Sequence, residues 1–231
     1  MSDRLYIVDL DGMEQSAVDL DDPTNLVFDY MRRIGDLLDG MSPARPAPLR
    51  VLHVGGGGMS LPRYVAATRP RSSQIVLEPD VELIAEVRAQ APLPARSGIR
   101  VRGVDGASGI LGVADASQNV VILDAFEHGE VPEELMTAGF LEQVQRVLVG
   151  RGVFVANVVD QRPFTHVRSL VGLARGLGAV VVGAEAATAK GRRRGNVLVA
   201  CGAVPWPTFG TPSPMDYRVY TGRTVADTFG A

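Results

Sequence analysis

The chain has 231 residues, 46% of them apolar, and a formal net charge of -3. This length is enough for one sizeable α/β domain with a small appendage, and the charge gives no indication of a nucleic-acid surface. The single cysteine, Cys201, excludes an internal disulfide and a thiolate zinc site and fits a reducing cytoplasm. Cys201 lies in an apolar run, so we expect a buried thiol. No apolar run has the length of a membrane span and no signal peptide is evident, so we expect no membrane contact.

The first twenty-two residues predict a small β-hairpin. Residues 5–8 are β-prone, Asp11-Gly12 is a strong hairpin-turn signal, and a second strand is expected over residues 13–18. We therefore interpret residues 1–22 as an N-terminal β-hairpin that precedes the main domain.

A helix is predicted directly after the hairpin. Asp22 has the side chain of an N-cap, and Pro23 suits the first helical position. Apolar side chains then recur at helical spacing: Val27, Tyr30, Met31, Ile34, Leu37 and Leu38. We expect this face to pack on the domain and the helix to end at Gly40, before a proline-rich connector at 42–48.

From Arg50 onward, strands and helices are predicted to alternate. Strands are expected at 50–54, 74–78, 99–104, 120–123, 152–158, 179–183 and 196–201, with helices near 60–68, 80–90, 137–148 and 164–176. Such alternation predicts a parallel sheet covered on both faces. The last two strands lack a helix-length spacer and should pair antiparallel. The fold class is therefore α/β, with a Rossmann-like, seven-stranded sheet of the S-adenosylmethionine-dependent methyltransferase type, mostly parallel with the last strand antiparallel.

This core is expected to span residues 23–204. Prolines and glycines interrupt the remainder, 205–231, which we interpret as an irregular C-terminal tail or a segment that packs on a partner. The basic run Lys190–Gly195 precedes the last strand, and its simplest interpretation is a solvated hairpin tip rather than an anion site.

A glycine turn marks the candidate site. The first strand of the core ends at Gly55-Gly56-Gly57-Gly58 and is followed by a helix, which is how a nucleotide-binding βαβ unit begins. Glycines let the backbone turn sharply and approach a ligand. Glu78 ends the second strand about twenty residues later, where an acid accepts hydrogen bonds from the ribose hydroxyls of a nucleoside. The pair predicts a nucleoside site.

Two more strands end in acids at the same edge of the sheet. Asp105 is placed to accept the exocyclic amine of adenine, with Gly106 leaving room for the ring, and Asp124 would face the reacting end of the ligand. A cationic sulfonium donor favours such a carboxylate-lined mouth. The alternative is that Asp105 and Asp124 serve only as helix N-caps.

The order and spacing of these motifs resemble the spermidine synthase (polyamine aminopropyltransferase) family. The motifs are Val-Gly-Gly-Gly-Gly at 54–58, Leu-Glu-Pro-Asp at 77–80, Val-Asp-Gly at 104–106 and Leu-Asp-Ala-Phe at 123–126. The similarity covers about Leu5 to Cys201, including a hairpin shorter than the family's N-terminal domain. The resemblance implies a homodimer and a donor that is S-adenosylmethionine or decarboxylated S-adenosylmethionine. It also implies a small-molecule acceptor, such as a polyamine, and no metal.

Residue by residue, the resemblance implies two sets of site residues. The nucleoside would be held by Gln15, Gly55, Gly56, Gly57, Glu78, Asp105 and Gly106. Asp124 would be the catalytic acid that orients the acceptor amine and accepts its proton, and Glu127 would replace the second acid of the family's Asp-x-x-Asp.

The chain also departs from the family pattern. Gly58 stands where the family usually has an aspartate that binds the donor's ammonium, and Leu26 and Val27 stand where it has an amine-binding tyrosine and glutamine. The family's donor-binding residues are thus better kept than its polyamine-binding residues. An acid at position 58 would repel the carboxylate of intact S-adenosylmethionine, so its absence makes the intact form more plausible as a donor.

Three functions therefore stay open. The first is aminopropyl transfer to a small amine, with Asp124 and Glu127 binding the acceptor. The second is methyl transfer to a small acceptor, with His128 as a possible base. The third is nucleoside binding without catalysis.

Overall fold

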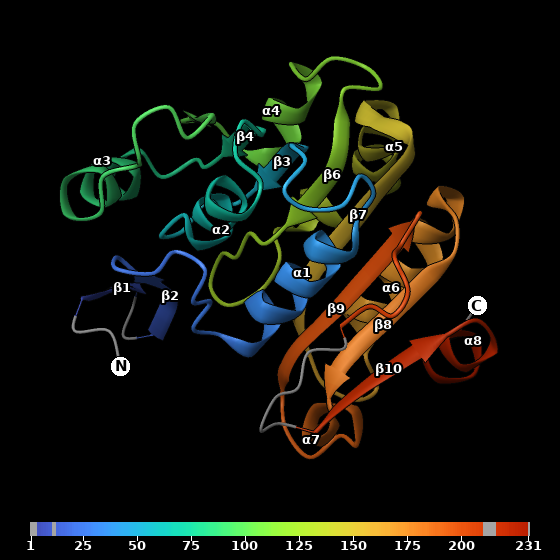
Figure 1. Cartoon of the computed structure of the whole chain (residues 1–231). Helices are drawn as coiled ribbons and strands as arrows, with labels where there is room; N and C mark the ends of the chain where they lie inside the picture. Colours follow the sequence, from blue (N-terminus) through green and yellow to red (C-terminus); the bar gives the residue numbers. More distant parts are fainter. Residues whose placement is uncertain (1–3, 11–12, 210–215, 231) are drawn as a thin grey trace.

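A computed structural model describes residues 4–10, 13–209 and 216–230 of the chain, and the side chains of residues 9, 10 and 13–15 lie outside this description. The chain begins with an antiparallel hairpin of β1 (Leu5–Leu10) and β2 (Met13–Asp19). The turn predicted at Asp11-Gly12 lies outside the described residues. Figure 1 shows this hairpin beside α2, at one side of the main sheet.

The main sheet has eight strands in the order β10-β8-β9-β7-β6-β3-β4-β5. They are β3 (Arg50–Val54), β4 (Ser73–Leu77), β5 (Ile99–Arg102), β6 (Gln118–Leu123), β7 (Leu148–Asp160), β8 (Val180–Glu185), β9 (Gly195–Gly202) and β10 (Tyr217–Thr221). Strands β3 to β7 run parallel, and β9 lies antiparallel between β7 and β8. The predicted methyltransferase-type sheet is confirmed, and β10 extends it by an eighth, edge strand.

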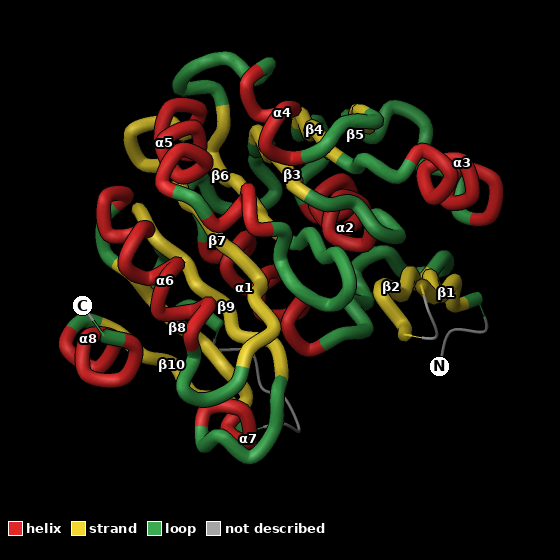
Figure 2. Tube along the Cα trace, turned by 180° about the vertical axis from the view of Figure 1, so that it is seen from behind, coloured by secondary structure: helices red, strands yellow, loops and turns green. Residues whose placement is uncertain are grey.

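Helices cover both faces of this sheet. One face carries α1 (Asp29–Gly40), α2 (Ser60–Thr68) and α3 (Val81–Gln90), and the other carries α4 (Gly106–Leu111), α5 (Ala138–Val147), α6 (Thr165–Ala174) and α8 (Arg223–Phe229). Shorter turns, η1 (Glu133–Met136), η2 (Arg175–Leu177) and α7 (Ala186–Ala189), lie in the connections. The two opposite views show α1 and α2 in front of the sheet and α5 and α6 behind it (Figures 1 and 2).

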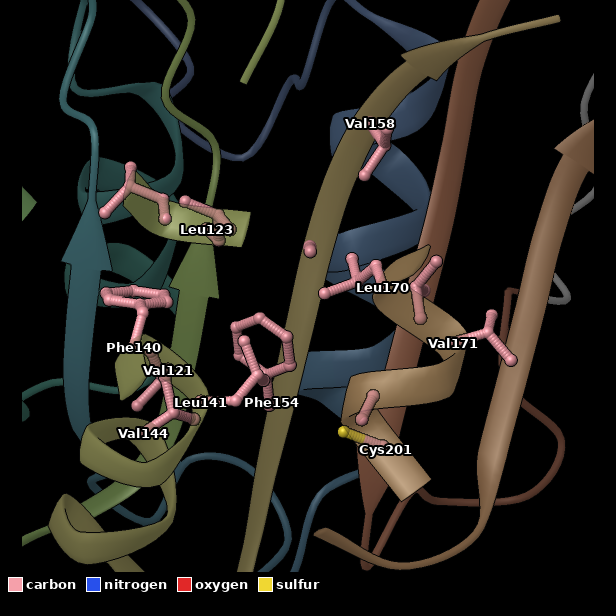
Figure 3. Close-up of a cluster of buried hydrophobic side chains, with 14 of the residues drawn as sticks. Val121, Leu123, Phe140, Leu141, Val144, Phe154, Val158, Leu170, Val171 and Cys201 are labelled. Carbon is pink, nitrogen blue, oxygen red and sulfur yellow. The ribbon is translucent and has the colours of Figure 1, made fainter. Parts of the chain in front are cut away.

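The larger apolar cluster lies between the sheet and the second layer of helices. Figure 3 shows side chains of α5 and α6 meeting those of β6 and β7, with Phe154 between them. Cys201 of β9 is buried in this cluster, as predicted, and burial raises the pKa of its thiol to about 12. The thiol is therefore a packing group and not a nucleophile.

The first core helix begins later than predicted. The sequence indicated a start at Asp22-Pro23, but α1 begins at Asp29. The Asp22 carboxylate instead closes a local turn by accepting the backbone N–H and the hydroxyl of Thr24. Leu26 then forms a β-bridge with Val18, so the chain stays extended along the hairpin before it turns into the helix.

The prediction of an irregular tail over 205–231 was wrong for its second half. Residues 217–221 form β10, which pairs antiparallel with β8, and α8 follows it. Phe229 of α8 is buried against Phe164 and Tyr220, with ring centroids 5.4 and 5.2 Å away. Most of the prolines and glycines that suggested irregularity precede Tyr217 in the sequence, so they do not interrupt β10 itself.

None of the helices in the described part of the chain combines the length and apolarity that crossing a membrane requires.

Candidate active site

A cavity of about 490 Å³ opens at the carboxyl ends of β3, β4 and β6. Its lining includes eight of the nine predicted site residues: Gly55, Gly56, Gly57, Glu78, Asp105, Gly106, Asp124 and Glu127. The side chain of the ninth, Gln15, lies outside the described residues, although Ser16 beside it lines the cavity. Four segments that follow β3, β4, β5 and β6 thus meet at one hollow, as the carboxyl edge of a parallel sheet predicts, and the hairpin adds a fifth.

The glycine turn is fixed by close approaches of backbone to backbone. Gly55 has φ +93°, and a Cβ there would lie 2.2 Å from the carbonyl oxygen of Asp124. No other residue type fits this position, because the ends of β3 and β6 pass too close to each other. The Asp124 N–H donates to the Val54 carbonyl at 2.9 Å, so the turn and Asp124 lie side by side in the cavity lining.

Glu78 is tied to the same turn. Its Oε2 accepts a hydrogen bond of 2.8 Å from the Gly56 N–H, and its Oε1 accepts one of 3.1 Å from the Asp80 N–H. Only 8% of Glu78 is exposed, so its carboxylate is held in one place at the tip of β4. That place is the one from which an acid reaches a ribose diol in a nucleotide-binding βαβ unit.

Asp105 is both a helix N-cap and a cavity-lining acid, the two alternatives that the sequence left open. Its Oδ1 caps α4 by accepting the Ser108 N–H at 2.8 Å, and this bond to backbone lowers the pKa of the carboxyl. The residue also lines the cavity. Gly106 is required by packing, because a Cβ there would lie 2.4 Å from Cγ1 of Val54.

Asp124 is held by two hydrogen bonds from elements on either side of it. Its Oδ1 accepts the amide of Asn157 on β7 at 3.0 Å, and its Oδ2 accepts the hydroxyl of Tyr30 on α1 at 3.3 Å. Burial raises the pKa of Asp124, while the two hydrogen bonds act in the opposite direction. The result is a carboxylate that is oriented and more basic than an ordinary aspartate, as a general base requires.

Sequence reasoning missed both partners of Asp124. Tyr30 was assigned to the apolar face of the first helix, and the family's amine-binding tyrosine was aligned with Leu26. In the structure, burial and the Asp124 charge raise the pKa of Tyr30, so its hydroxyl stays protonated and donates. Asn157 was placed only within a strand, although a polar residue inside an apolar run was a usable signal.

The loop after Asp124 carries the other candidate residues. Glu127 is exposed and lines the cavity, and its backbone pairs with Glu130 across a short bridge. His128 is exposed and is not among the lining residues, so nothing in this arrangement favours it as the base for an acceptor at Asp124.

The lining is strongly acidic. Among the described residues it includes six carboxylates and no lysine, arginine or histidine: Glu78, Asp80, Asp105, Asp124, Glu127 and Glu134. No group of three or more potential metal ligands was found in the described part of the chain. The electrostatics of the cavity therefore favour a cationic ligand.

Gly58 faces the hairpin and not an open part of the cavity. A Cβ at this position would lie 2.9 Å from both Ser16 Oγ and Val18 Cγ2 of β2. The hairpin is held there by the Ser60 hydroxyl, which contacts Ser16 Oγ at 3.2 Å and donates to the carbonyl of Ala17. An aspartate at position 58 has no room unless the hairpin moves.

Known proteins resemble this chain over part of its sequence. No family model matches the chain. A polyamine aminopropyltransferase from Chromobacterium violaceum is 30% identical over 144 residues, which are 62% of this chain and 53% of that protein. One from Vibrio vulnificus is 36% identical over 116 residues, 48% of this chain and 38% of that protein. The chain thus matches about half the length or less of these curated relatives.

Solved structures show the same fold. A probable spermidine synthase from Corynebacterium glutamicum superposes with a TM-score of 0.89 at 24% identity, over 97% of this chain and 86% of that one. Human methyltransferase-like protein 13 in complex with SAH superposes with a TM-score of 0.61 at 22% identity, over 80% and 86%. The resemblance to spermidine synthases predicted from the sequence is confirmed, and the chain shares the fold of these solved structures, with a methyltransferase-type sheet.

Proposed function

We propose that this protein transfers an aminopropyl group from decarboxylated S-adenosylmethionine to a small amine. The proposal rests on the charged side chains that line the main cavity around Asp124, which among the described residues are all acidic. The decarboxylated donor has a sulfonium and an ammonium, and both are attracted by such a cavity. Intact S-adenosylmethionine also has a carboxylate, for which the described lining offers no cationic side chain.

The donor's nucleoside would occupy the half of the cavity between β3, β4 and β5. The turn at 55–57 would approach it closely, Glu78 would accept the ribose hydroxyls, and Asp105 would accept the adenine amine beside Gly106. Gln15 of the hairpin would complete this half. The names of the two curated relatives support the same donor class.

The acceptor would react beside Asp124. Its ammonium loses a proton to the Asp124 carboxylate, and the free nitrogen lone pair attacks the carbon next to the sulfonium sulfur. A C–N bond forms, the C–S bond breaks, and its electron pair neutralises the sulfur to give methylthioadenosine. Tyr30 and Asn157 keep the carboxylate oriented for the proton, and Glu127 at the mouth attracts the cationic acceptor.

Methyl transfer from intact S-adenosylmethionine is the second candidate. The observation in its favour is Gly58, since the packing of β2 leaves no room for the acid that binds the donor ammonium in the family. The acidic lining is the stronger observation. Its six carboxylates favour the more cationic donor, which is the decarboxylated one, whereas Gly58 concerns only the ammonium of the donor.

Calorimetric titration tests these functions directly. The purified chain is titrated with decarboxylated S-adenosylmethionine, the intact form and methylthioadenosine, and turnover is then assayed with putrescine and spermidine. We expect tighter binding of the decarboxylated form and release of methylthioadenosine. Tighter binding of the intact donor, with methyl transfer, would replace the proposal by the second candidate. Binding of methylthioadenosine without turnover of either donor would support the third function, nucleoside binding alone.

We also propose that the protein is a homodimer. Leu5 and Ile7 on β1 are 46% and 44% exposed, although β1 belongs to a sheet of only two strands. Such a hairpin buries little by itself and is stabilised by a partner surface. We expect sedimentation at micromolar concentration to give the mass of a dimer. A monomer under these conditions would contradict the proposal.

A further inference from the structure

A second cavity, of about 320 Å³, shares Tyr30 with the main one. The hydroxyl of this residue bonds to Asp124. The second cavity is lined by Phe28, Asp29, Tyr30, Glu185, Arg193, Arg194, Gly195, Asn196 and Tyr217. Because the two cavities share this wall, an acceptor whose amine lies at Asp124 needs only to pass Tyr30 to reach the second one.

The charge of the second cavity differs from that of the first. Two guanidinium groups, those of Arg193 and Arg194, line it, whereas the described lining of the main cavity has no cation. Its two acids already have cationic partners: Glu185 pairs with Arg193, and Asp29 pairs with Arg33 at 3.3 Å. A second ammonium on the acceptor therefore gains much less here than at Asp124.

Both arginines are able to bind a further acceptor. Arg194 donates to Glu130 at 3.1 Å and to the Gly129 carbonyl at 3.2 Å, and its side chain is 43% exposed. The side chain of Arg193, which pairs with Glu185, is 55% exposed. Each guanidinium has five N–H donors, so an entering carboxylate can share the two groups with Glu185 and Glu130.

Tyr217 forms a fixed wall of the second cavity. Its ring is held by Arg33, whose guanidinium carbon lies 4.3 Å above it, and by the edge of Phe209. Its buried hydroxyl lies toward Gly183 of β8, which does not line the cavity. The polar groups that a ligand meets in this cavity are therefore the guanidinium groups and not this hydroxyl.

We infer that the acceptor is an amine with a carboxylate at the end remote from the reacting nitrogen, that is, a diamino acid and not a plain diamine. This inference rests on the proposed aminopropyl transfer and adds the class of acceptor. The amine lies at Asp124, the chain passes Tyr30, and the carboxylate meets Arg193 and Arg194. The basic run is thus more than the solvated tip expected from the sequence, because two of its arginines line a cavity.

Matched acceptors test the inference. Putrescine and ornithine differ only by a carboxylate, as do cadaverine and lysine. With the decarboxylated donor we expect kcat/KM for ornithine or lysine to exceed that for its diamine at least about tenfold, as a charge-assisted hydrogen bond provides. Arg193→Gln and Arg194→Gln should each remove about tenfold of that preference and leave the diamine rate within about twofold.

Two variants serve as controls. Arg192→Gln changes an exposed arginine of the same run that does not line the cavity, so it should leave both rates unchanged. Glu130→Gln breaks the ion pair of Arg194 but keeps the guanidinium, so the carboxylate preference should persist. If Glu130→Gln lowers the rates as Arg194→Gln does, Arg194 only holds the loop and the inference fails.

The remaining outcomes separate this inference from the proposed function. A wild-type preference for the plain diamine overturns the inference and leaves aminopropyl transfer standing. If neither acceptor is turned over, aminopropyl transfer fails, and calorimetry with the protein saturated in methylthioadenosine decides the acceptor class alone. If ornithine then binds more tightly than putrescine, and Arg194→Gln abolishes this difference, the carboxylate subsite is supported. Equal or weaker binding of ornithine by the wild type overturns the inference.

Discussion

At the scale of single residues, the central question is how one carboxylate is made basic enough to accept a proton. Asp124 sits where burial disfavours its charge, and two neutral donors, Tyr30 and Asn157, stabilise that charge. Neutral donors orient a carboxylate and lower its pKa less than an adjacent arginine would. The raised pKa and the fixed orientation are therefore consequences of the same packing.

Replacing Asp124 by asparagine tests its role as proton acceptor. The side chain keeps its size and hydrogen bonding but loses its charge, so the donor should still bind while turnover of an amine falls by about 10²–10⁴-fold. Donor affinity is measured by calorimetry and turnover by release of methylthioadenosine. Turnover that stays within about threefold of wild type would exclude Asp124 as the base, given how large that loss usually is.

Tyr30→Phe tests the tuning of the same group. The Tyr30 hydroxyl bond lowers the pKa of Asp124, so its loss should let burial raise that pKa further. Asp124 acts as a base only when ionised, and turnover is lost as the pH falls through its pKa. The acid limb of the kcat/KM profile should therefore move to higher pH in the variant, with activity retained on the alkaline side. A limb that stays in place would show that Tyr30 does not act on Asp124.

Some site residues can be predicted from the sequence, whereas others are recognised only once the fold is known. Glycines and acids at strand ends, such as Gly55, Glu78 and Asp124, could be predicted because chain order alone brings the carboxyl ends of parallel strands together. Tyr30 reaches Asp124 because α1 begins at Asp29 and packs beside the end of β6. Asn157 reaches Asp124 because β7 pairs with β6. Such contacts depend on helix placement, which local patterns do not specify.

At the scale of elements, the C-terminal strand and helix extend the sheet and close one side of the core. β10 pairs with β8 over five residues, and α8 then folds back so that Val225 and Phe229 enter the larger apolar cluster. Tyr217 at the start of β10 also lines the second cavity. This segment therefore contributes both to stability and to the predicted acceptor site.

Phe229→Ala measures the contribution of this segment to stability. Phe229 is 2% exposed and packs against two aromatic rings, so its truncation should lower the free energy of unfolding by about 3 kcal/mol. Urea denaturation monitors the change. Trp206→Ala is the control from the same C-terminal segment, since Trp206 is 73% exposed and should change stability by less than about 0.5 kcal/mol. Equal effects of the two variants would mean that α8 is not docked.

The alternation of strands and helices was predictable from residue 50 to 202, because each buried strand is a short apolar run bounded by turn residues. The β10–α8 unit was not, because five strand residues at a sheet edge are only half-buried and have a weak apolar signal. The late start of α1 has a similar cause. Asp22 forms a good local cap, and the bridge between Leu26 and Val18 overrides it.

At the scale of the whole molecule, we expect acid stability to depend on a histidine buried in the middle of the fold. His53 on β3 is 2% exposed, and burial lowers its pKa to about 4. Gln74 donates its amide to the Pro62 carbonyl, so its oxygen accepts from Nε2 of the neutral His53 ring at 2.9 Å. The folded protein therefore holds this ring uncharged until the pH is far below the range in which an exposed histidine titrates.

The unfolded chain protonates His53 near pH 6.5, whereas the folded protein does so only near pH 4. Between these values the unfolded state binds more protons, so stability falls as the pH falls from about 6.5 to about 4. We expect the wild type to lose about 2 kcal/mol more than His53→Gln between pH 7 and pH 4.5, by urea denaturation at both pH values. Comparing the two differences removes any constant cost of the substitution. His166→Gln, at an exposed position on α6, should keep the wild-type loss. The same loss in His53→Gln as in the wild type would show that another group governs acid unfolding.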